Sequence, residues 1–453
     1  MTRATAFALI LAAATADPAI AQPAPGRQPA RDDAVVLTLE DAIERGLATS
    51  HRLAEAAARG DAARAAVDER HSALLPVVAA QAGYTRTNHV DTFGILLPNN
   101  QFRVIYPDIP DNYRTRLDLQ WPIYTAGRLD ALERAAQAEA AASQDDLAAA
   151  RADLKLEVTR AYWALVTSIE SLRVVDQSVG RVEAQLQDVR NQFTAGLVPP
   201  NDVSSVEAQR SRQRMLRVQA GTTRDVAEAE LARMIGAEPG TSIRPVSPLA
   251  PPATADVRTG ASLAVSMVEE ARSGRAERAA LAKRVEAADE RRRAAAAGSR
   301  PAVAVGGGVD YARPNPRIFP REPAWRESWD ASINVNWALF DGGRTRGEVA
   351  EAAALARAAK ERLADFEASV AVEVRQRLSE LESSQAAIAA ADDAVRSAGD
   401  ARRVVGDRFG AGVATSTDVL DAQVALLQAE LDRTQAIANA RLAEARLARA
   451  LGK

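Results

Sequence analysis

The chain has 453 residues, with 57 lysine and arginine residues against 60 aspartate and glutamate residues. This near balance lacks the strongly basic surface that nucleic-acid binding usually requires, so no nucleic-acid partner is expected. Cysteine is absent, which excludes a disulfide framework, and aromatic residues make up only 4% of the chain. An alanine-rich, charge-rich composition with helical periodicity indicates long helices rather than one large compact core.

The N-terminus has the pattern of a secretory signal peptide. A basic start, Met1–Arg3, precedes an apolar run from Ala4 to Ala16, and Ala19–Ala21 has the spacing of a cleavage site. The run is shorter than the roughly 20 apolar residues that a membrane-spanning helix needs. We therefore expect residues 1–21 to be a signal peptide and residues 22–36 to be a flexible segment.

The strongest internal signal is a repeat. The sequence LDLQWPIYTAGR at residues 117–128 returns as INVNWALFDGGR at residues 333–344, an offset of 216 (333 minus 117). Three further pairs keep this offset: FTAG at 193–196 and FGAG at 409–412, DV at 202–203 and 418–419, and LARMIG at 231–236 and LARALG at 447–452. Because Trp, Gly and Asp stay in register, the pattern predicts two internal structural repeats.

We place the first repeat at residues 37–236 and the second at 261–453, joined by a Pro-rich linker at 237–260 that we expect to be exposed. Each repeat is predicted to contain a helix, a β-hairpin and a long helical hairpin. The bounds in the two repeats are 38–75 and 261–298 for the helix, 77–125 and 302–341 for the β-hairpin, and 127–236 and 343–452 for the helical hairpin. Thr38 and Asp41 have the spacing of a capping box at the first helix start.

The predicted strands alternate apolar and polar residues. Ala331, Ile333, Val335 and Trp337 are separated by polar residues, and residues 115–121 have the same pattern. The alternation is typical of a transmembrane β-barrel strand, although it also fits an antiparallel sheet packed on an ordinary core. The rest of each repeat offers no other core for this face, so the membrane interpretation is favoured. Long tips are expected over residues 89–112 and 314–327 of the two hairpins.

Aromatic residues concentrate in these hairpins. Thirteen of the 19 lie in residues 73–125 or 301–341. Aromatic side chains form belts where a barrel meets the lipid headgroups. The residues predicted to form such belts are Trp121, Tyr124, Trp329, Trp337 and Phe340.

The long helices have the spacing of a coiled coil. Apolar residues recur every seven positions at Val158, Leu165, Leu172, Val179, Leu186 and Phe193, and in the second repeat at Val374, Leu381, Ile388 and Val395. A helix of about 69 residues is roughly 100 Å long at 1.5 Å per residue. Each long helix is predicted to end at a turn, beginning at Gly196 or Gly412, from which a second helix returns.

Four strands per chain are too few for a stable structure in lipid. Each unpaired backbone group at a bare strand edge costs several kcal/mol there. Two chains would supply eight strands, whose interior is filled by side chains, whereas three would supply twelve around a usable lumen. We therefore predict an α+β membrane protein: a homotrimeric 12-stranded β-barrel in lipid, continued by a long α-helical coiled-coil barrel.

No catalytic, cofactor or metal site is predicted. The three histidines, His51, His71 and His89, have no metal-ligand spacing, and Gly306–Gly308 lacks the Lys-Ser/Thr of a phosphate loop. The alternative to a channel is a periplasmic coiled-coil adaptor or scaffold of a secretion system. Such adaptors usually have one helical hairpin, whereas this sequence predicts two matched ones.

The chain resembles the TolC family of outer membrane factors over about residues 35–453. The resemblance is carried by the opening helix (LTLEDAI), the helix-to-strand junction (ALLP), the strand-to-helix junctions at residues 121–128 and 337–344, and the turns after Gly196 and Gly412. It implies an outer-membrane barrel with a periplasmic helical barrel. It also implies docking onto a periplasmic adaptor protein and an inner-membrane pump, in drug or metal efflux or in type I protein secretion.

The resemblance also implies functional residues at the helical tips. The residues matched to the adaptor-docking turns are Gly196, Leu197, Val198, Gly412, Val413 and Ala414. Asp418, Asp421 and Asp202 match a ring at the periplasmic entrance, and such a ring favours cations. Helix capping is an equal alternative for Asp202 and Asp418. Phe409 and Ala414 replace a family tyrosine and arginine that help to close the entrance, so closure is expected to use other contacts.

Overall fold

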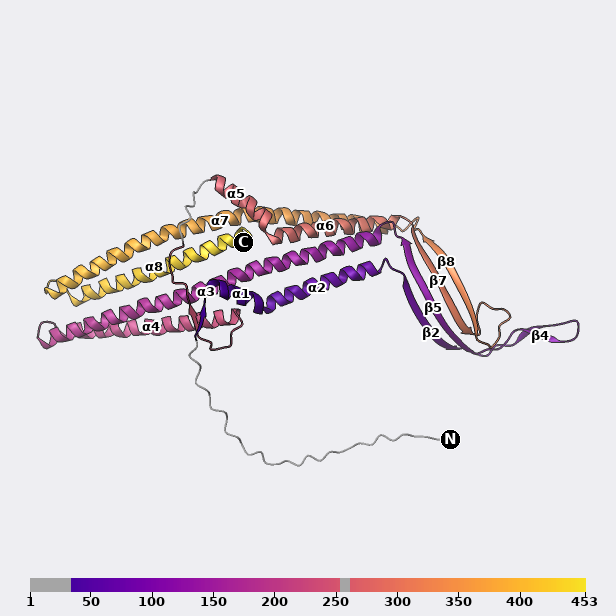
Figure 1. Ribbon diagram of the computed structural model, residues 1–453, viewed down its shortest axis with the longest axis horizontal. Coiled ribbons are helices and arrows are strands. Elements are labelled where there is room, and N and C mark those ends of the chain that lie inside the picture. Colours follow the sequence, from indigo (N-terminus) through magenta and orange to yellow (C-terminus); the bar gives the residue numbers. More distant parts are fainter. Residues whose placement is uncertain (1–33, 253–260) are drawn as a thin grey trace, which may run out of the picture.

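The computed structural model describes residues 34–252 and 261–453, so the expected signal peptide at 1–21 lies outside the described residues. Figure 1 shows a long helical bundle with a β-sheet at one end. The helices therefore extend from one end of the sheet, and their turns lie far from it.

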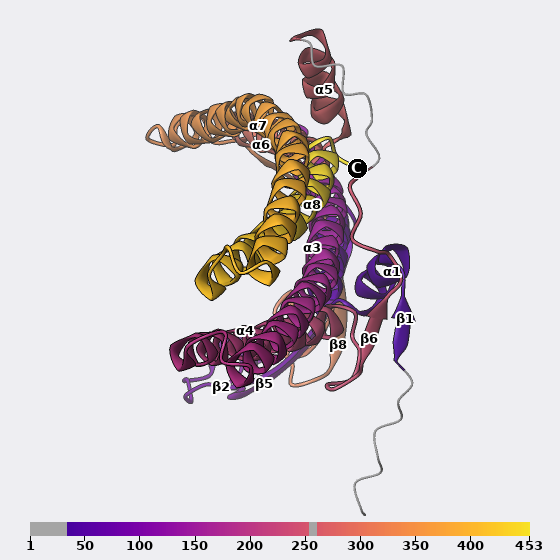
Figure 2. The ribbon, with the colours of Figure 1, turned by 90° about the vertical axis from the view of Figure 1, so that its left-hand side faces the viewer.

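Two long helices of equal length organise the bundle. Helix α3 (Arg128–Thr194) and helix α7 (Arg344–Gly410) contain 67 residues each, about 100 Å at 1.5 Å per residue. Helix α4 (Pro200–Met234) returns along α3, and helix α8 (Ser416–Ala450) returns along α7, with 35 residues each. The end view in Figure 2 shows the two pairs as neighbouring arms. The arms contact each other through α3 of the first pair and α8 of the second.

The sheet-proximal halves of the long helices are covered by shorter helices, each broken once. The helix expected over 38–75 forms α1 (Leu39–Thr49) and α2 (His51–Ser72), because Ser50 is extended and its hydroxyl accepts the Leu53 N–H. The predicted capping box of Thr38 and Asp41 is confirmed at the start of α1.

The corresponding break in the second half lies at Arg275. The helix expected over 261–298 forms α5 (Ala261–Gly274), α6 (Ala276–Ala296) and a short 3-10 turn, Ala297–Ser299. The Arg275 side chain is buried and donates from Nε to the Ala450 carbonyl at 2.7 Å, next to the end of α8. The single-helix prediction is therefore wrong in both halves, because a side chain holds an extended residue at each break.

Two short strands lie in segments that the sequence predicted to be a flexible segment and an exposed linker, so both predictions are corrected here. Strand β1 (Val35–Leu37) pairs in parallel with β6 (Ile243–Pro245), which lies inside the linker expected to be exposed. Leu37 and Ile243 are buried against α3, where the Tyr162 hydroxyl lies 3.3 Å from the Leu37 carbonyl. Burial of these apolar side chains attaches the connection between the halves to the bundle, and Figure 2 shows β1, β6 and α1 together on one side.

The sheet contains four antiparallel strands in the order β2-β5-β7-β8. Their bounds are Val77–Arg86 for β2, Asp111–Tyr124 for β5, Ala302–Arg313 for β7 and Arg326–Asn336 for β8. The first expected tip contains a separate hairpin of β3 (Phe93–Leu96) and β4 (Phe102–Tyr106) rather than loop alone. In the described chain β2 and β8 each pair on one side only, so both edges of this sheet are open.

The two faces of the sheet differ in polarity. Arg116 lies opposite Asp310 on one face, whereas Leu117, Ile333 and Trp329 occupy the other with 51%, 71% and 75% of their surface exposed. An apolar face of this extent indicates contact with a partner or an apolar medium.

Glycine is required at one position of the polar face. A Cβ added at Gly308 would lie 2.7 Å from an Arg116 guanidinium nitrogen and 2.8 Å from the Leu117 carbonyl oxygen. Gly83 on β2 has no neighbour within 4 Å of the corresponding position. The two glycines therefore differ in steric demand although both lie in strands of one sheet.

We predict that Gly308→Ala lowers the free energy of unfolding by about 1–3 kcal/mol, because the new methyl group must displace strand β5 or the Arg116 side chain. Urea denaturation followed by tryptophan fluorescence measures the change. Gly83→Ala is the matched control and is expected to leave the midpoint near that of the wild type. Equal midpoints for the two variants would contradict the steric requirement at Gly308.

Candidate functional site

The turns at the far end of the bundle have one geometry. Ala195 is the C-cap of α3, and Gly196 follows with φ of +76°, a conformation that glycine adopts without strain. The Leu197 N–H donates to the Gln192 carbonyl at 2.9 Å, which closes a Schellman turn. Gly412 has φ of +72° and begins an equivalent turn after α7. The sequence-predicted turn residues therefore lie at the tips of the two helical hairpins.

The tips present apolar side chains. Leu197 is 74% exposed and Val413 is 63% exposed, and they occupy the same position in the two turns. Val198 and Ala414, one residue later, are half-buried. The end of the bundle therefore carries one exposed apolar side chain on each hairpin.

The three aspartates predicted near the tips have different environments. Asp418 caps α8: one carboxylate oxygen accepts the Thr415 N–H at 2.8 Å and its hydroxyl at 2.7 Å. The Thr415 N–H, followed by the hydroxyl, lowers the pKa of Asp418 below its usual value. Asp421 is exposed one turn deeper in α8, and Asp202 is half-buried in α4, which begins at Pro200 without a side-chain cap. The capping alternative thus describes the contacts of Asp418.

An apolar cluster joins the two hairpins behind the tips. We call it the tip cluster; its buried members are Val182, Leu186, Val189 and Val206, and its half-buried members are Val198, Val203, Phe409 and Leu420. Phe409 and Leu420 come from the second hairpin and the others from the first. Deeper in the bundle, Arg181 of α3 forms an ion pair with Glu430 of α8 at 2.7 Å. Phe409 thus makes an apolar contact between the hairpins.

Aromatic residues gather at both ends of the sheet. At the helix end, the indole nitrogens of Trp121 and Trp337 donate to the carbonyls of Leu74 and Ser299, each at 3.1 Å. These bonds connect each strand end to the helical segment that enters the sheet beside it. Tyr124 and Phe340, the other aromatics predicted at this end, are 52% and 92% exposed.

The opposite end carries an aromatic group that the sequence reasoning missed. Tyr113 lies 5.0 Å from Tyr84 and 5.9 Å from Trp325, and Tyr311 stacks on Trp325 at 5.0 Å, all between ring centroids. Trp329 lies at the same end of the sheet, near the start of β8 and opposite Val309. The contacts depend on strand register, which sequence spacing does not reveal.

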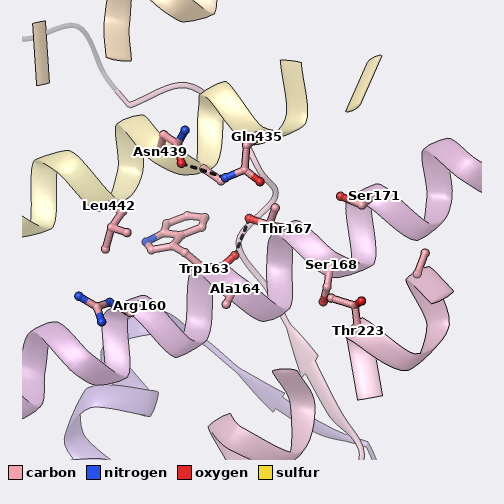
Figure 3. Close-up of a pocket in the computed structure, with 12 residues that line it drawn as sticks. Arg160, Trp163, Ala164, Thr167, Ser168, Ser171, Thr223, Gln435, Asn439 and Leu442 are labelled. Carbon is pink, nitrogen blue, oxygen red and sulfur yellow. Dashed lines mark hydrogen bonds between the residues drawn. The ribbon is translucent and has the colours of Figure 1, made fainter. Parts of the chain in front are cut away.

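A cavity of about 370 Å³ lies between α3, α4 and α8 (Figure 3). Trp163 forms part of its wall, and the hydroxyl groups of Thr167, Ser168 and Thr223 each donate to a carbonyl of their own helix. The amide nitrogen of Gln435 donates to Asn439 on the same helix. These polar groups are satisfied locally, so they do not converge on the cavity as the groups of a reactive site would.

Residues 42–237 and 267–453 match the family described as outer membrane efflux protein. The chain belongs to this family. Family membership places it in the bacterial outer membrane and assigns it to efflux, which is transport rather than catalysis. This outcome confirms the predicted resemblance to the TolC family and sets aside the coiled-coil adaptor.

Three individual proteins are similar to this chain over about half of its length or more. Outer membrane protein TolC of Vibrio cholerae is 26% identical over 408 residues, which cover 88% of this chain and 87% of TolC. Protein CyaE of Bordetella pertussis is 30% identical over 239 residues, which cover 52% of this chain and about half of CyaE (47%). The crystal structure of VceC from Vibrio cholerae has a TM-score of 0.76 at 21% identity and covers 91% of this chain and 96% of its own, which shows a shared fold.

Two kinds of feature are absent from the residues that the structure describes. Within residues 34–252 and 261–453, no helix combines the length and the apolarity that crossing a membrane requires. The same parts of the chain contain no cluster of three or more histidine, aspartate or glutamate side chains arranged to hold a metal ion.

Proposed function

We propose that three copies of this chain form an outer-membrane channel, in which each contributes four strands to a 12-stranded barrel and its helices to a periplasmic tube. The observation that carries this proposal is the amphipathic sheet with open edges at β2 and β8. In lipid, the unpaired backbone groups of those edges cost several kcal/mol each unless another chain pairs with them. Three sheets of four strands form the smallest closed assembly with a usable lumen.

The spacing of the aromatic residues supports the proposed position in the bilayer. Tyr113 and Tyr124 lie eleven residues apart on β5 (124 minus 113), which is about 36 Å of extended strand. A strand tilt of about 40° reduces this to roughly 28 Å, close to the apolar band of about 25 Å on outer-membrane barrels. The proposed belt at the helix end therefore comprises Trp121, Tyr124, Trp337 and Phe340. The proposed belt at the other end comprises Trp329 together with Tyr84, Tyr113, Tyr311 and Trp325.

The helical tips are then the periplasmic entrance. The long helices carry them about 100 Å from the sheet, a length suited to a periplasmic duct. We assign adaptor docking to the two turns, where Leu197 and Val413 offer exposed apolar contacts, and the inner-membrane pump would lie beyond the adaptor. Around the threefold axis, Asp421 together with Asp418 and Asp202 would form the acidic entrance ring. Cargo of the drug, metal-ion or protein class would pass through either an efflux or a type I secretion assembly.

The oligomeric state tests the channel directly. The purified protein in mild detergent is expected to give a trimer by native mass spectrometry, and membranes containing it are expected to retain it after a high-salt wash. The prediction follows from the open strand edges, which only neighbouring copies complete. A water-soluble monomer without affinity for bilayers would overturn the proposed function.

We predict that Asp421→Ala weakens the block of single-channel current by multivalent cations applied from the entrance side, because three carboxylates leave the proposed ring. Planar-bilayer recordings measure the blocking concentration. Asp432→Ala removes an exposed carboxylate deeper in the same helix and is the matched control, with no change expected. Unchanged block in the Asp421 variant would remove this residue from the ring.

We predict that Phe409→Ala increases the time that the channel spends in a high-conductance state. Phe409 packs into the tip cluster, so its truncation weakens the contact between the hairpins of one chain. Phe193→Ala is the matched control, since Phe193 holds the corresponding position in the first hairpin and is 47% exposed. Equal open probabilities in the wild type and the Phe409 variant would exclude the tip cluster from closure.

A further inference from the structure

We propose that Arg116 keeps the membrane-embedded end of the channel unselective between cations and anions, by neutralising aspartates on the inner wall. The proposal rests on the proposed function, which places the polar face of the sheet toward the lumen. It concerns a group of charges that we call the Arg116 network. Its members are Arg114, Arg116, Arg317, Asp118, Asp310 and Asp330.

The network spans three neighbouring strands of the sheet, β5, β7 and β8 (Figure 1). Arg116 lies directly opposite Asp310, and both Asp118 and Asp330 lie opposite Gly308. Because directly paired residues share a face, the three aspartates and Arg116 project from the same side of the sheet. The strand register therefore places one arginine among three carboxylates.

The Arg116 guanidinium contacts all three carboxylates. Nε donates to Asp118 at 2.6 Å, and Nη1 donates to Asp310 at 2.5 Å and to Asp330 at 2.9 Å. The side chain of Arg116 is only 13% exposed and that of Asp310 only 1%. The planar guanidinium presents five N–H donors in a fixed fork, so it can serve several carboxylates at once, which an ammonium group on lysine does less well.

Gly308 makes room for this arrangement. Any side chain at this position would meet the Arg116 guanidinium, as described for the fold. The absence of a side chain at Gly308 on strand β7 therefore leaves the space that the Arg116 side chain from β5 occupies. A glycine without such a role, Gly83, shows that the sheet does not require the same clearance everywhere.

The charges of the network cancel. Arg114 adds a second contact to Asp310 at 2.6 Å, and Arg317 from the β7–β8 tip reaches Asp330 at 2.7 Å. Three arginines therefore balance three aspartates in each chain. Asp118 has Arg116 as its ion-pair partner among the described residues, so loss of Arg116 leaves this carboxylate without a counter-charge.

The balance has a direct consequence for transport. Uncompensated rings of charge in a pore favour ions of opposite sign, and low-dielectric walls strengthen the effect. A compensated wall favours neither sign, so discrimination by charge falls to the periplasmic entrance. Neutralising one member would leave one net charge in each chain and three around the proposed trimer.

Reversal potentials in a potassium chloride gradient across planar bilayers test the assignment. Arg116→Gln is expected to shift the reversal potential toward the potassium equilibrium value, and Asp118→Asn toward the chloride value. The double variant Arg116→Gln with Asp118→Asn restores the charge balance, so its potential returns toward that of the wild type. Glu327→Gln is the matched control, because Glu327 is exposed on the opposite face of β8 and no shift is expected.

The outcomes separate this inference from the proposed function. Wild-type protein that forms no channels would overturn the proposed function itself. Channels whose reversal potential is unchanged in Arg116→Gln and Asp118→Asn would overturn the role of the Arg116 network alone. If Arg116→Gln does not assemble, Asp118→Asn decides the question, since Asp118 is 24% exposed and the substitution removes its charge at nearly constant side-chain volume.

Discussion

The open edges of the β2-β5-β7-β8 sheet are the constraint on which the rest of the structure depends. A sheet with an exposed apolar face and unpaired edge strands is an aggregation hazard in water and an incomplete structure in lipid. The pairing between copies that we propose would remove both problems at once and would set the spacing of the helices attached to the strands. The helical bundle follows this spacing, because α3 and α7 start directly after β5 and β8.

The strand-to-helix junctions fix the direction in which α3 and α7 leave the ends of β5 and β8. Gly127 and Gly343, with φ of +79° and +91°, turn the chain from strand into helix where a residue with a Cβ would be strained. At the second junction the Asp341 carboxylate accepts hydrogen bonds from the hydroxyl and N–H of Thr345, which lower its pKa to about 2. The carboxylate thus remains ionised at neutral pH and supplies the N-terminal negative charge that a helix dipole favours.

The sequence patterns predicted those structural features that depend on local and periodic spacing. The seven-residue spacing around Val158 and Leu165 identified the long helices, and the paired landmarks Trp121 and Trp337 located the ends of two strands. The equal lengths of α3 and α7, and of α4 and α8, support the proposed duplication. These features need only neighbouring residues to define them, which explains why spacing alone revealed them.

Most of the missed features depend on contacts between distant segments. Strands β1 and β6 have three residues each and lie about 200 positions apart, so no periodic signal marks their pairing. The Arg116 network depends on the register of three strands. The capping of Asp418 is different, because Thr415 and Asp418 have the same local spacing as the capping box of Thr38 and Asp41. This contact could therefore have been predicted from the sequence, and it distinguishes Asp418 from Asp421 on the helix surface.

The tip cluster and the buried polar residues behind it assign different roles to the two parts of the helical bundle. Gln185, Gln213 and Gln423 are buried in α3, α4 and α8, at depths where the neighbouring seam holds valine and leucine. Polar side chains in a coiled-coil core specify register at a cost in stability. The buried glutamines thus specify the alignment of the hairpins in their tip-proximal part, where cohesion depends on a few apolar contacts, including that of Phe409. A device that opens this end needs to disrupt only that small cluster, whereas the sheet-proximal half, covered by α2 and α6, stays packed.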